Sequence, residues 1–479
     1  MAEQLKANTA RFEIEEVLQA TGGSGVNFRY DDYGNKVEGV VTDSRVFQQE
    51  EDESSHLFVA LRGEKFDAHN FLPQVDGDAL AALVETPQPE LLLLQIQVPD
   101  TLIALGDLAR YHRRRFKVPI IGITGSYGKT STRALLDAIL STEYNTLASQ
   151  GNFNNEIGVP MTLFQLDATH EAAIIEMGMR GRGQIEYLAR VAEPTIGLIT
   201  SIGPQHIELL GSLEEIARAK AELCENIPEG GLMVLPLDAP FFELLRTKAK
   251  CRVVTFGAGE GADYRVSGVQ VAPDGRVEFS VEFDGREQPV VLNIPGVHNA
   301  LNAGAAFAVA HQMGLESETI ALALESAQLP GARMRVVQAN GFTLIDDCYN
   351  AGPDSTRAAL QTLLDFPGSG RRVAVLGDMK ELGEFSEGEH RKIGAFAGQF
   401  VELLMGVGGE TRPLLNAAIQ AAREVENEME THWFASAGDA KEVVRDFLRE
   451  SDVVLVKGSR SVGLEAVVEA LVSSSERRA

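Results

Sequence analysis

The sequence has only three cysteines, and they lie far apart. Cys224, Cys251 and Cys348 have neither the close spacing of a metal site nor the even number of a disulfide framework. Sparse cysteine use is typical of proteins that fold in a reducing compartment. The sequence therefore predicts free thiols and a cytoplasmic location.

Long hydrophobic runs are also missing. The longest aliphatic cluster, LLLLQIQV at 91–98, is much shorter than the roughly 20 residues that span a bilayer. The N-terminal stretch does not join a basic end to an apolar core, so no signal peptide is expected. We therefore expect no insertion in a membrane.

Positive charge is scarce as well. The chain has 43 Lys and Arg against 69 Asp and Glu, for a formal net charge of −26. A protein that binds nucleic acid along its phosphates needs a basic face, so this charge argues against nucleic acid as a partner. A pocket on an acidic protein can still be locally basic, and small anionic substrates remain compatible with this composition.

What the chain does have is the length and balance of an ordinary multidomain protein. At 479 residues it is too long for one hydrophobic core, which predicts two to four domains. Its 44% apolar and 23% charged residues are typical of globular chains, so disorder is not expected.

Strand and helix patterns alternate along the chain. The N-terminal part has strand patterns at 40–45 and 57–63, followed by a helical pattern at 102–117. We expect Arg113, Arg114 and Arg115 at the solvated end of that helix. Further along, buried strands are predicted at 120–123, 172–176 and 196–200 and helices at 130–140, 183–190, 213–224 and 298–313. This alternation predicts a doubly wound α/β domain.

Two changes of pattern divide the rest of the chain. Between 253 and 294 polar and apolar residues alternate, and the run 276–283 before Asp284-Gly285 predicts a hairpin in a small antiparallel extension. Turn residues at 329–331 indicate a domain boundary. Beyond it, strands are predicted at 342–347, 372–377 and 453–458, with helical segments between them. The expected fold is α/β in three domains, 1–100, 101–329 and 330–479, the last being Rossmann-like.

One stretch, IIGITGSYGKTS, carries an evident chemical pattern. It joins a strand to a helix through a glycine-rich turn, where unpaired backbone N–H groups and the helix dipole favour an anion. Gly125 and Gly128 allow the backbone to approach closely, Lys129 supplies charge for terminal phosphates, and the Thr130 hydroxyl can hold Mg²⁺. The pattern favours nucleotide binding.

The match to a phosphate loop is incomplete. Ile123 stands where the standard loop has its first glycine, and the alternative is an ordinary strand-to-helix turn with a solvated lysine. A phosphate loop also fails to distinguish a motor, a kinase and a ligase, so other residues must decide the activity.

Three residues after the loop have two interpretations each. Glu176 ends a buried strand, where it is placed as a second Mg²⁺ ligand or as a helix cap or solvated acid. His206 follows the next strand, and a lone histidine is more often structural than a metal ligand. Lys220 lies on a helix among alanines, where a solvated lysine is the simplest interpretation.

Four more residues remain ambiguous in the same way. Asn299 and Asn302 share one helical face, which suits either a purine edge or a helix cap. Arg333 offers a delocalised cation for phosphoryl charge, and Asp347 at a strand end could accept ribose hydroxyls. Either of the last two could equally belong to an interdomain ion pair.

Taken in order, the motifs of the chain resemble those of the Mur ligase family, the ATP-dependent amide-forming enzymes of peptidoglycan precursor synthesis. The motifs are VTDSR at 41–45, FDAH at 66–69, GITGSYGKTST at 122–132, GNFNNEIGVP at 151–160, EMG at 176–178, DDCYNAGPDS at 346–355, LGDMKELG at 376–383 and VKGSRS at 456–461. The last three are similar to the family type that joins D-alanyl-D-alanine to UDP-N-acetylmuramoyl-tripeptide. The Asp-Asn-Pro-Arg stretch of the relative that adds diaminopimelate or lysine is absent.

The resemblance implies ATP and Mg²⁺ as cofactors, the tripeptide nucleotide and D-alanyl-D-alanine as substrates, and a monomer. It implies Lys129, Glu176, His206 and Lys220 as catalytic residues. The implied ATP-binding residues are Thr124, Gly125, Ser126, Tyr127, Gly128, Lys129, Thr130, Asn299, Asn302, Arg333 and Asp347. The implied substrate-binding residues are Ser44, Arg45, Asn154, Asn155, Tyr349 and Asn350. The implied metal ligands are Thr130, Glu176, His206 and Lys220, the last as a carbamate.

Three positions depart from the family pattern. Tyr127 replaces an asparagine, Ala68 a glycine and Gly352 an asparagine, and the last lies on the dipeptide side. Two alternative functions stay open: a ligase for another amino acid, or a nucleotide-dependent binding protein without catalysis on the same scaffold.

Overall fold

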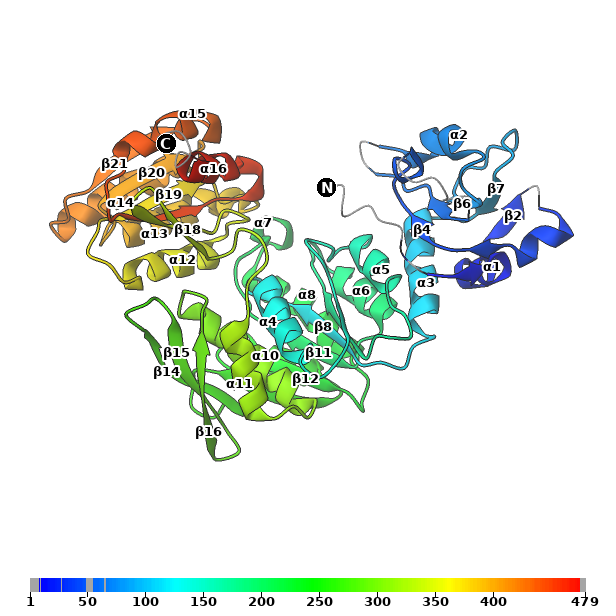
Figure 1. Ribbon diagram of the computed structural model, residues 1–479, viewed down its shortest axis with the longest axis horizontal. Coiled ribbons are helices and arrows are strands. Elements are labelled where there is room, and N and C mark those ends of the chain that lie inside the picture. Colours follow the sequence, from blue (N-terminus) through cyan, green and yellow to red (C-terminus); the bar gives the residue numbers. More distant parts are fainter. Residues whose placement is uncertain (1–7, 9, 27, 49–54, 64–65, 474–479) are drawn as a thin grey trace.

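The computed structural model describes residues 8, 10–26, 28–48, 55–63 and 66–473. The chain forms three α/β units arranged as a V, with the central unit at its base and the N-terminal and C-terminal units at its two tips (Figure 1). This is the predicted fold class, with one main sheet in each unit. The exact domain boundaries remain a prediction.

The N-terminal unit is built on a five-stranded sheet of order β2-β7-β6-β5-β4, in which only β2 is antiparallel. Its strands are Ser24–Val26 (β2), Leu94–Gln97 (β7), Ala81–Val84 (β6), Leu57–Val59 (β5) and Val40–Val41 (β4). A two-stranded ladder joins Phe12–Glu13 (β1) to Lys36–Val37 (β3). The helices are Ile14–Thr21 (α1) and Leu72–Val75 (α2), with 3₁₀ turns Tyr30–Gly34 (η2), Val46–Gln48 (η3) and Ala68–Phe71 (η4).

Helix Thr101–Arg113 (α3) connects this unit to the central one. Asp100 caps its start by accepting hydrogen bonds from the N–H groups of Leu102 (2.8 Å) and Ile103 (2.9 Å). The expectation that Arg113 is solvated is wrong: the side chain is buried, and its Nε donates to the carbonyl oxygen of Ala192 at 2.9 Å. A sequence pattern cannot show that another helix covers a helix end.

The central unit contains a nine-stranded sheet of order β16-β15-β14-β13-β12-β11-β8-β10-β9. The strands are Thr146–Ala148 (β9), Ala172–Glu176 (β10), Ile120–Thr124 (β8), Ile196–Ile199 (β11), Leu232–Pro236 (β12), Arg252–Gly257 (β13), Tyr264–Val271 (β14), Val277–Phe283 (β15) and Arg286–Leu292 (β16). The predicted hairpin is confirmed: β15 and β16 pair antiparallel through Asp284 and Gly285, which both have positive φ angles.

The helices of the central unit cover both faces of its parallel strands. They are Lys129–Leu140 (α4), Gly158–Leu163 (α5), Gln184–Ala192 (α6), Ile207–Leu210 (α7), Leu213–Asn226 (α8), Phe242–Lys248 (α9), His298–Gln312 (α10) and Ser317–Ser326 (α11). The alanine-rich α10 packs directly against α4, because its small side chains let the two helices approach.

The C-terminal unit is a six-stranded sheet of order β17-β18-β22-β19-β20-β21, parallel except at β17. The strands are Arg335–Ala339 (β17), Phe342–Asp346 (β18), Val453–Lys457 (β22), Arg372–Gly377 (β19), Leu403–Val407 (β20) and Glu430–Phe434 (β21). The helical segments are Pro353–Asp365 (α12), Gly383–Phe385 (η5), Ser386–Ala397 (α13), Thr411–Glu424 (α14), Ala437–Val443 (α15), Val444–Phe447 (η6), Arg460–Val462 (η7) and Glu465–Ser473 (α16).

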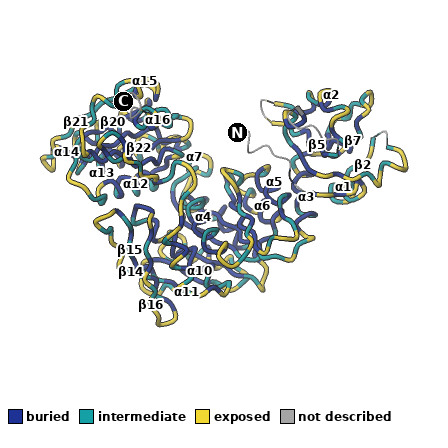
Figure 2. Tube along the Cα trace, in the orientation of Figure 1, coloured by how far each residue is buried: buried dark blue, intermediate teal, exposed yellow. Residues whose placement is uncertain are grey.

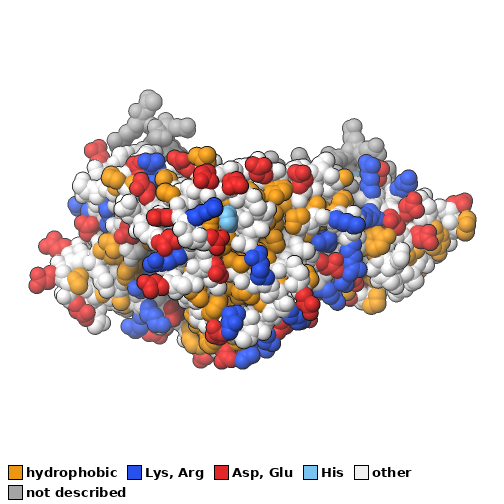
Figure 3. All heavy atoms as spheres, turned by 90° about the horizontal axis from the view of Figure 1, so that it is seen from below, with side chains coloured by type: hydrophobic (Ala, Val, Ile, Leu, Met, Phe, Trp, Pro, Cys, Tyr) orange, Lys and Arg blue, Asp and Glu red, His pale blue; other side chains and the backbone are white. Residues whose placement is uncertain are grey.

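Burial follows the sheets, whose strands form the dark interior of each unit in Figure 2. All five residues of β8, of β10 and of β22 are buried, which explains their continuous apolar runs. The surface seen from below carries acidic side chains among the basic ones (Figure 3). In the part of the chain that the structure describes, no helix has both the length and the apolar character needed to cross a membrane.

Candidate active site

The glycine-rich turn joins the central strand β8 to helix α4, as predicted. The first hydrogen bond of α4 runs from the N–H of Thr132 to the carbonyl oxygen of Gly128 at 2.8 Å. The N–H groups of Gly128, Lys129, Thr130 and Ser131 therefore have no partner within the helix. Gly128 has φ +82°, and a Cβ there would lie 2.5 Å from Oδ1 of Asn302. The turn is thus an anion-binding helix start that requires glycine.

A second loop, which follows β11, holds this turn in place. The contacts between the two loops are made by backbone and hydroxyl groups. The N–H of Ser126 donates to the carbonyl oxygen of Ser201 (3.0 Å), and the N–H of Tyr127 donates to Ser201 Oγ (2.9 Å). Ser126 Oγ donates to the carbonyl oxygen of Gly203 at 2.9 Å. Residues of two adjacent strand ends therefore determine the shape of the loop.

Lys129 lies over the turn that it follows. Its Nζ donates to the carbonyl oxygens of Gly125 (2.7 Å) and Ser126 (3.4 Å). Burial lowers the pKa of Lys129, while the carboxylate of Glu176 acts in the opposite direction. A cation held at this point is placed to meet the terminal phosphates of a nucleotide.

Glu176 ends β10 beside the loop, with only 2% of the residue exposed. Its Oε1 accepts a hydrogen bond from Nδ2 of Asn154 at 2.9 Å. Its Oε2 lies 3.7 Å from Nε of Arg133, and neither of these two buried atoms has a hydrogen-bond partner. An acid with one unsatisfied oxygen at a phosphate loop has the chemistry of a metal ligand.

Among the described residues, no three side chains of His, Cys, Asp or Glu form a ready-made metal cluster. Mg²⁺ does not require such a cluster, because it is commonly held by one or two carboxylates together with phosphate oxygens and water. Glu176 and the Thr130 hydroxyl, which both line the same cavity, therefore fit Mg²⁺ bound with a nucleotide.

Lys220 of α8 is not a solvated lysine. The residue is 2% exposed, and no ion pair of its ammonium group is found among the described residues. Burial, assisted by repulsion from Lys129, moves the pKa of Lys220 well below its usual value. Only the uncharged form of an amine reacts with CO₂, so a lowered pKa favours the chemistry of the carbamate implied by the family resemblance.

His206 lies directly before α7 and has a left-handed backbone, with φ +63°. Its Nδ1 lies 2.6 Å from Oε2 of Glu381, a residue of the C-terminal unit. Contact with His206 lowers the pKa of Glu381. The histidine thus meets the adjoining unit as well as the cavity.

The two asparagines of α10 bond to each other and to the phosphate-loop helix. Asn302 Nδ2 donates to Oδ1 of Asn299 (3.0 Å), and Thr132 Oγ1 donates to Oδ1 of Asn302 (3.4 Å). Asn299 Nδ2 donates to the carbonyl oxygen of Pro295 at 2.8 Å. In this arrangement they support the loop; both also line the cavity.

The C-terminal unit contributes a cation and an acid to the same region. Arg333 NH2 donates to Thr130 Oγ1 at 3.4 Å, and its guanidinium lies 3.8 Å above the ring of Tyr349. Asp347 is buried and accepts a hydrogen bond from Lys457 Nζ at 2.5 Å. Lys457 also donates to the carbonyl oxygen of Asn350 at 2.9 Å. Asp347 therefore pairs with a lysine of its own unit, whereas Arg333 reaches Thr130 of the central unit.

One cavity of about 1260 Å³ between the central and C-terminal units unites most of the predicted residues. The predicted residues that line it are Ser126, Tyr127, Gly128, Lys129, Thr130, Asn154, Asn155, Glu176, His206, Lys220, Asn299, Asn302, Arg333, Asp347, Tyr349 and Asn350. Thr124 and Gly125 are buried next to the loop. Asn155 has a second task, since its Oδ1 accepts from the N–H of Gly158 (2.8 Å) at the start of α5.

Ser44 and Arg45 do not line this cavity. They follow β4 in the N-terminal unit, where the exposed guanidinium of Arg45 pairs with Asp43. The structure therefore places these two residues apart from the residues predicted to bind ATP, in a different unit.

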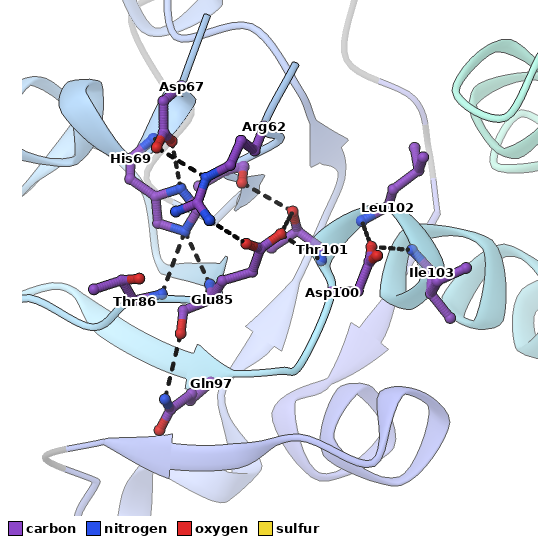
Figure 4. A network of polar contacts seen from close by, with 11 residues as sticks. Arg62, Asp67, His69, Glu85, Thr86, Gln97, Asp100, Thr101, Leu102 and Ile103 are labelled. Carbon is purple, nitrogen blue, oxygen red and sulfur yellow. Dashed lines mark hydrogen bonds and ion pairs between the residues drawn. The ribbon is translucent and has the colours of Figure 1, made fainter. Parts of the chain in front are cut away.

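Asp67 and the buried His69 of the FDAH motif belong to a partly buried polar network in the N-terminal unit, shown in Figure 4. His69 Nε2 accepts hydrogen bonds from the N–H groups of Glu85 (2.9 Å) and Thr86 (3.5 Å). Because Nε2 is an acceptor, the proton lies on Nδ1, which donates to Asp67 Oδ1 at 2.7 Å. The histidine therefore holds the loop after β6.

Glu85 extends this network to the junction with α3. Arg62 contacts both Asp67 (3.0 Å) and Glu85 (2.9 Å), and Thr101 Oγ1 donates to the carbonyl oxygen of Ala60 (3.0 Å). Figure 4 shows these side chains converging where α3 leaves the sheet.

Sequence reasoning missed Ser201 and Glu381, which line the cavity, and Arg133, which lies beside Glu176. Arg133 follows Lys129 by one helical turn, so its position on the loop-facing side of α4 was readable from the spacing. Ser201 and Glu381 carry no such signal, because their partners lie 74 or more residues away along the chain.

Comparison with known proteins identifies the family. Residues 123–310 match the Mur ligase middle domain, and residues 332–460 match the Mur ligase, glutamate ligase domain. The chain belongs to the Mur ligase family. ATP dependence is a property of Mur ligases.

Curated relatives cover nearly the full chain. A protein of Bacillus subtilis named UDP-N-acetylmuramoyl-tripeptide--D-alanyl-D-alanine ligase is 33% identical over 96% of this chain and 98% of its own length. A protein of Synechocystis sp. with the same name is 38% identical, with 98% and 99% covered.

Solved structures agree with these relatives. The crystal structure of MurF from Acinetobacter baumannii has a TM-score of 0.86 at 33% identity and covers 98% of this chain and 99% of its own. The structure of MurF ligase from Thermotoga maritima in complex with ADP has a TM-score of 0.80 at 25% identity, with 92% and 98% covered.

Proposed function

We propose that this protein is an ATP-dependent ligase that joins D-alanyl-D-alanine to UDP-N-acetylmuramoyl-tripeptide. The observation that carries the proposal is the single cavity, which the phosphate loop and Lys220 line from the central unit and Tyr349 and Asn350 from the C-terminal unit. The names of the full-length relatives support the choice of substrates.

Each unit takes one part of the reaction in this proposal. Residues 1–100 hold the uridine nucleotide, with Ser44 and Arg45 as contacts, residues 101–329 bind ATP, and residues 330–479 deliver the amine. The protein acts as a monomer in the cytoplasm.

The chemistry is a two-step ligation. A carboxylate is a poor acyl donor, so its oxygen first attacks the γ-phosphorus of ATP, the bond to the bridging oxygen breaks, and ADP leaves. The dipeptide amine then attacks the acyl carbon, the bond to phosphate breaks, and the amine loses a proton. The product is the pentapeptide nucleotide, with ADP and phosphate.

The residues of the chain supply positioning and charge for the first step. The free N–H groups of the phosphate loop and the Lys129 ammonium hold the terminal phosphates and offset the charge on the transferred group. Thr130, Glu176 and His206 are placed to hold Mg²⁺, together with Lys220 as a carbamate. Bound Mg²⁺ would supply further positive charge for the same purpose.

Water must be kept from the acyl phosphate, which it would hydrolyse. The cavity lies between two units, so a rotation of the C-terminal unit can enclose it. Gly331, with φ +70°, follows Pro330 in the connecting segment and is the candidate hinge.

One assay tests the proposal. ADP formation is measured with UDP-N-acetylmuramoyl-tripeptide, with and without D-alanyl-D-alanine. We expect ADP release to require both the tripeptide nucleotide and D-alanyl-D-alanine. Release that requires a different amino acid would identify another ligase, and the absence of turnover despite ATP binding would identify a binding protein.

A further inference from the structure

Glu381 belongs to the C-terminal unit, yet its carboxylate lies against the central unit. One oxygen, Oε2, lies 2.6 Å from Nδ1 of His206, and the other, Oε1, lies 3.2 Å from NH2 of Arg180. Both of these side chains come from loops at the strand ends of the central sheet, after β11 and β10 respectively. One carboxylate thus contacts two side chains of the central unit.

The segment that carries Glu381 is firmly attached to its own unit. The N–H of Met379 donates to Nε2 of His390 (3.0 Å), and the N–H of Lys380 donates to Oγ of Ser459 (3.0 Å). Leu382, directly after Glu381, is 2% exposed. The position of the Glu381 carboxylate therefore follows the position of the whole C-terminal unit.

The backbone on both sides of this contact has unusual conformations. His206 and Glu381 both have φ +63°, a left-handed conformation that residues with a side chain rarely adopt. Gly383 has φ +52°, and a Cβ there would lie 2.7 Å from Cγ of Glu208, so a larger residue would be strained. Figure 1 shows α7, which begins after His206, at the junction between the two units.

A histidine that holds a metal through one ring nitrogen usually has its other nitrogen bound to a carboxylate or carbonyl, which sets the tautomer and the ring orientation. Glu381 occupies that second position at Nδ1, which leaves Nε2 of His206 as the nitrogen for a metal. The two contacting atoms lie 2.6 Å apart without the alignment of a hydrogen bond.

We propose that Glu381 is a positioning residue that the C-terminal unit supplies to the metal site of the central unit, acting through His206. This inference rests on the metal role of His206 in the proposed function. Its consequence is that full affinity for a divalent cation requires the C-terminal unit to be docked.

Mn²⁺ binding tests this role without measuring turnover. The full chain is titrated with Mn²⁺ in the presence of saturating ADP, and free Mn²⁺ is measured by electron paramagnetic resonance. Glu381→Gln keeps the size of the side chain and removes its charge. We expect it to weaken Mn²⁺ binding by about 10- to 100-fold, the usual effect of losing a carboxylate behind a ligand histidine.

Glu384→Gln is the matched control, because Glu384 is an exposed acid of the same segment without a contact to His206. It should bind Mn²⁺ as the unchanged protein does. The double variant His206→Ala with Glu381→Gln should bind no more weakly than His206→Ala alone, since Glu381 acts only through the histidine.

The outcomes separate this inference from the proposed function. If His206→Ala weakens Mn²⁺ binding and Glu381→Gln does not, Glu381 forms a plain ion pair between units, and the positioning role is wrong while the ligase proposal stands. Additive losses in the double variant would also overturn it. Unchanged Mn²⁺ binding in His206→Ala would show that His206 does not hold the metal, and the inference about Glu381 would then be wrong. The ADP assay would still test the proposed ligase activity independently.

Discussion

The two junctions of the V differ in the side chains that meet there. At the first, between the N-terminal and central units, α3 buries Ala104, Leu105 and Leu108 within one continuous apolar cluster. A Cβ on Gly106 would lie 2.1 Å from the Tyr187 hydroxyl, so α3 and α6 lie in close contact. At the second junction an apolar cluster also runs from the central into the C-terminal unit, but the two units line a cavity there as well, and many of the side chains around it are charged or polar.

This difference has a physical consequence. Separating an apolar junction exposes surface to water, and the free energy cost grows with the area exposed. Charged contacts at a partly exposed junction can be exchanged for water at little net cost. The first junction is therefore suited to hold two units at a constant distance, and the second to open and close around ligands.

The largest expected effect comes from breaking the first junction. Leu105→Ala removes a fully buried side chain of α3 and should lower the free energy of unfolding by about 2–5 kcal/mol. Chemical denaturation followed by circular dichroism measures it. Leu92→Ala, at a residue 92% exposed, is the control and should change stability by less than about 0.5 kcal/mol. Equal stability of the two variants would contradict a packed junction.

At the second junction the first target is the phosphate loop. Lys129→Ala should slow ADP formation by about 100- to 1000-fold, as expected when a charge-stabilising donor is lost from a reaction site, and should leave the protein folded. Lys117→Ala, an exposed lysine before β8, should keep normal turnover. Near-normal turnover of the Lys129 variant would refute the assignment of the loop.

Lys220 gives a chemically specific test of the same site. Lys220→Ala should lose activity by about 100-fold, which corresponds to about 2.7 kcal/mol, and short carboxylic acids such as acetate should restore part of it by replacing the carbamate. The assay is ADP formation with and without added acid. A variant that is fully active without acid would reject the carbamate.

The smallest expected effect is a change in stability when an arginine is replaced at each of the two junctions. Arg113→Met leaves the buried carbonyl oxygens of Ala192 and Glu193 without their donor and should cost about 1–3 kcal/mol of stability. Arg180→Met, at a side chain 72% exposed, should change stability by less than about 1 kcal/mol. Thermal unfolding measures both, and a reversed order would show that the junctions are not as different as their burial indicates.

Local patterns predicted the parts of the fold that local physics decides. The phosphate loop was readable because a strand, a glycine turn, a lysine and a helix follow each other within twelve residues. The β15–β16 hairpin was readable because Asp284-Gly285 accepts the positive φ angles that its turn requires. Neither feature needs a distant partner.

Features that depend on distant partners were not readable. The helix end at Arg113 looked solvated until α6 was seen to cover it. Lys220 looked like a solvated lysine until the fold buried it, with no ion pair among the residues that the structure describes. In both cases the residue type is unchanged, and only the tertiary structure shows that the side chain is buried.

The sequence by itself determined the α/β class, the position of the phosphate loop and, through the order of its motifs, the family. Only the tertiary structure decided that Glu176 lies near Arg133, that Asn299 and Asn302 support the loop, and that Glu381 reaches His206 from another unit. Strand and helix patterns repeat within a few residues and can be read along the chain. Burial and charge contacts arise where distant segments meet, so they exist only after the chain has folded.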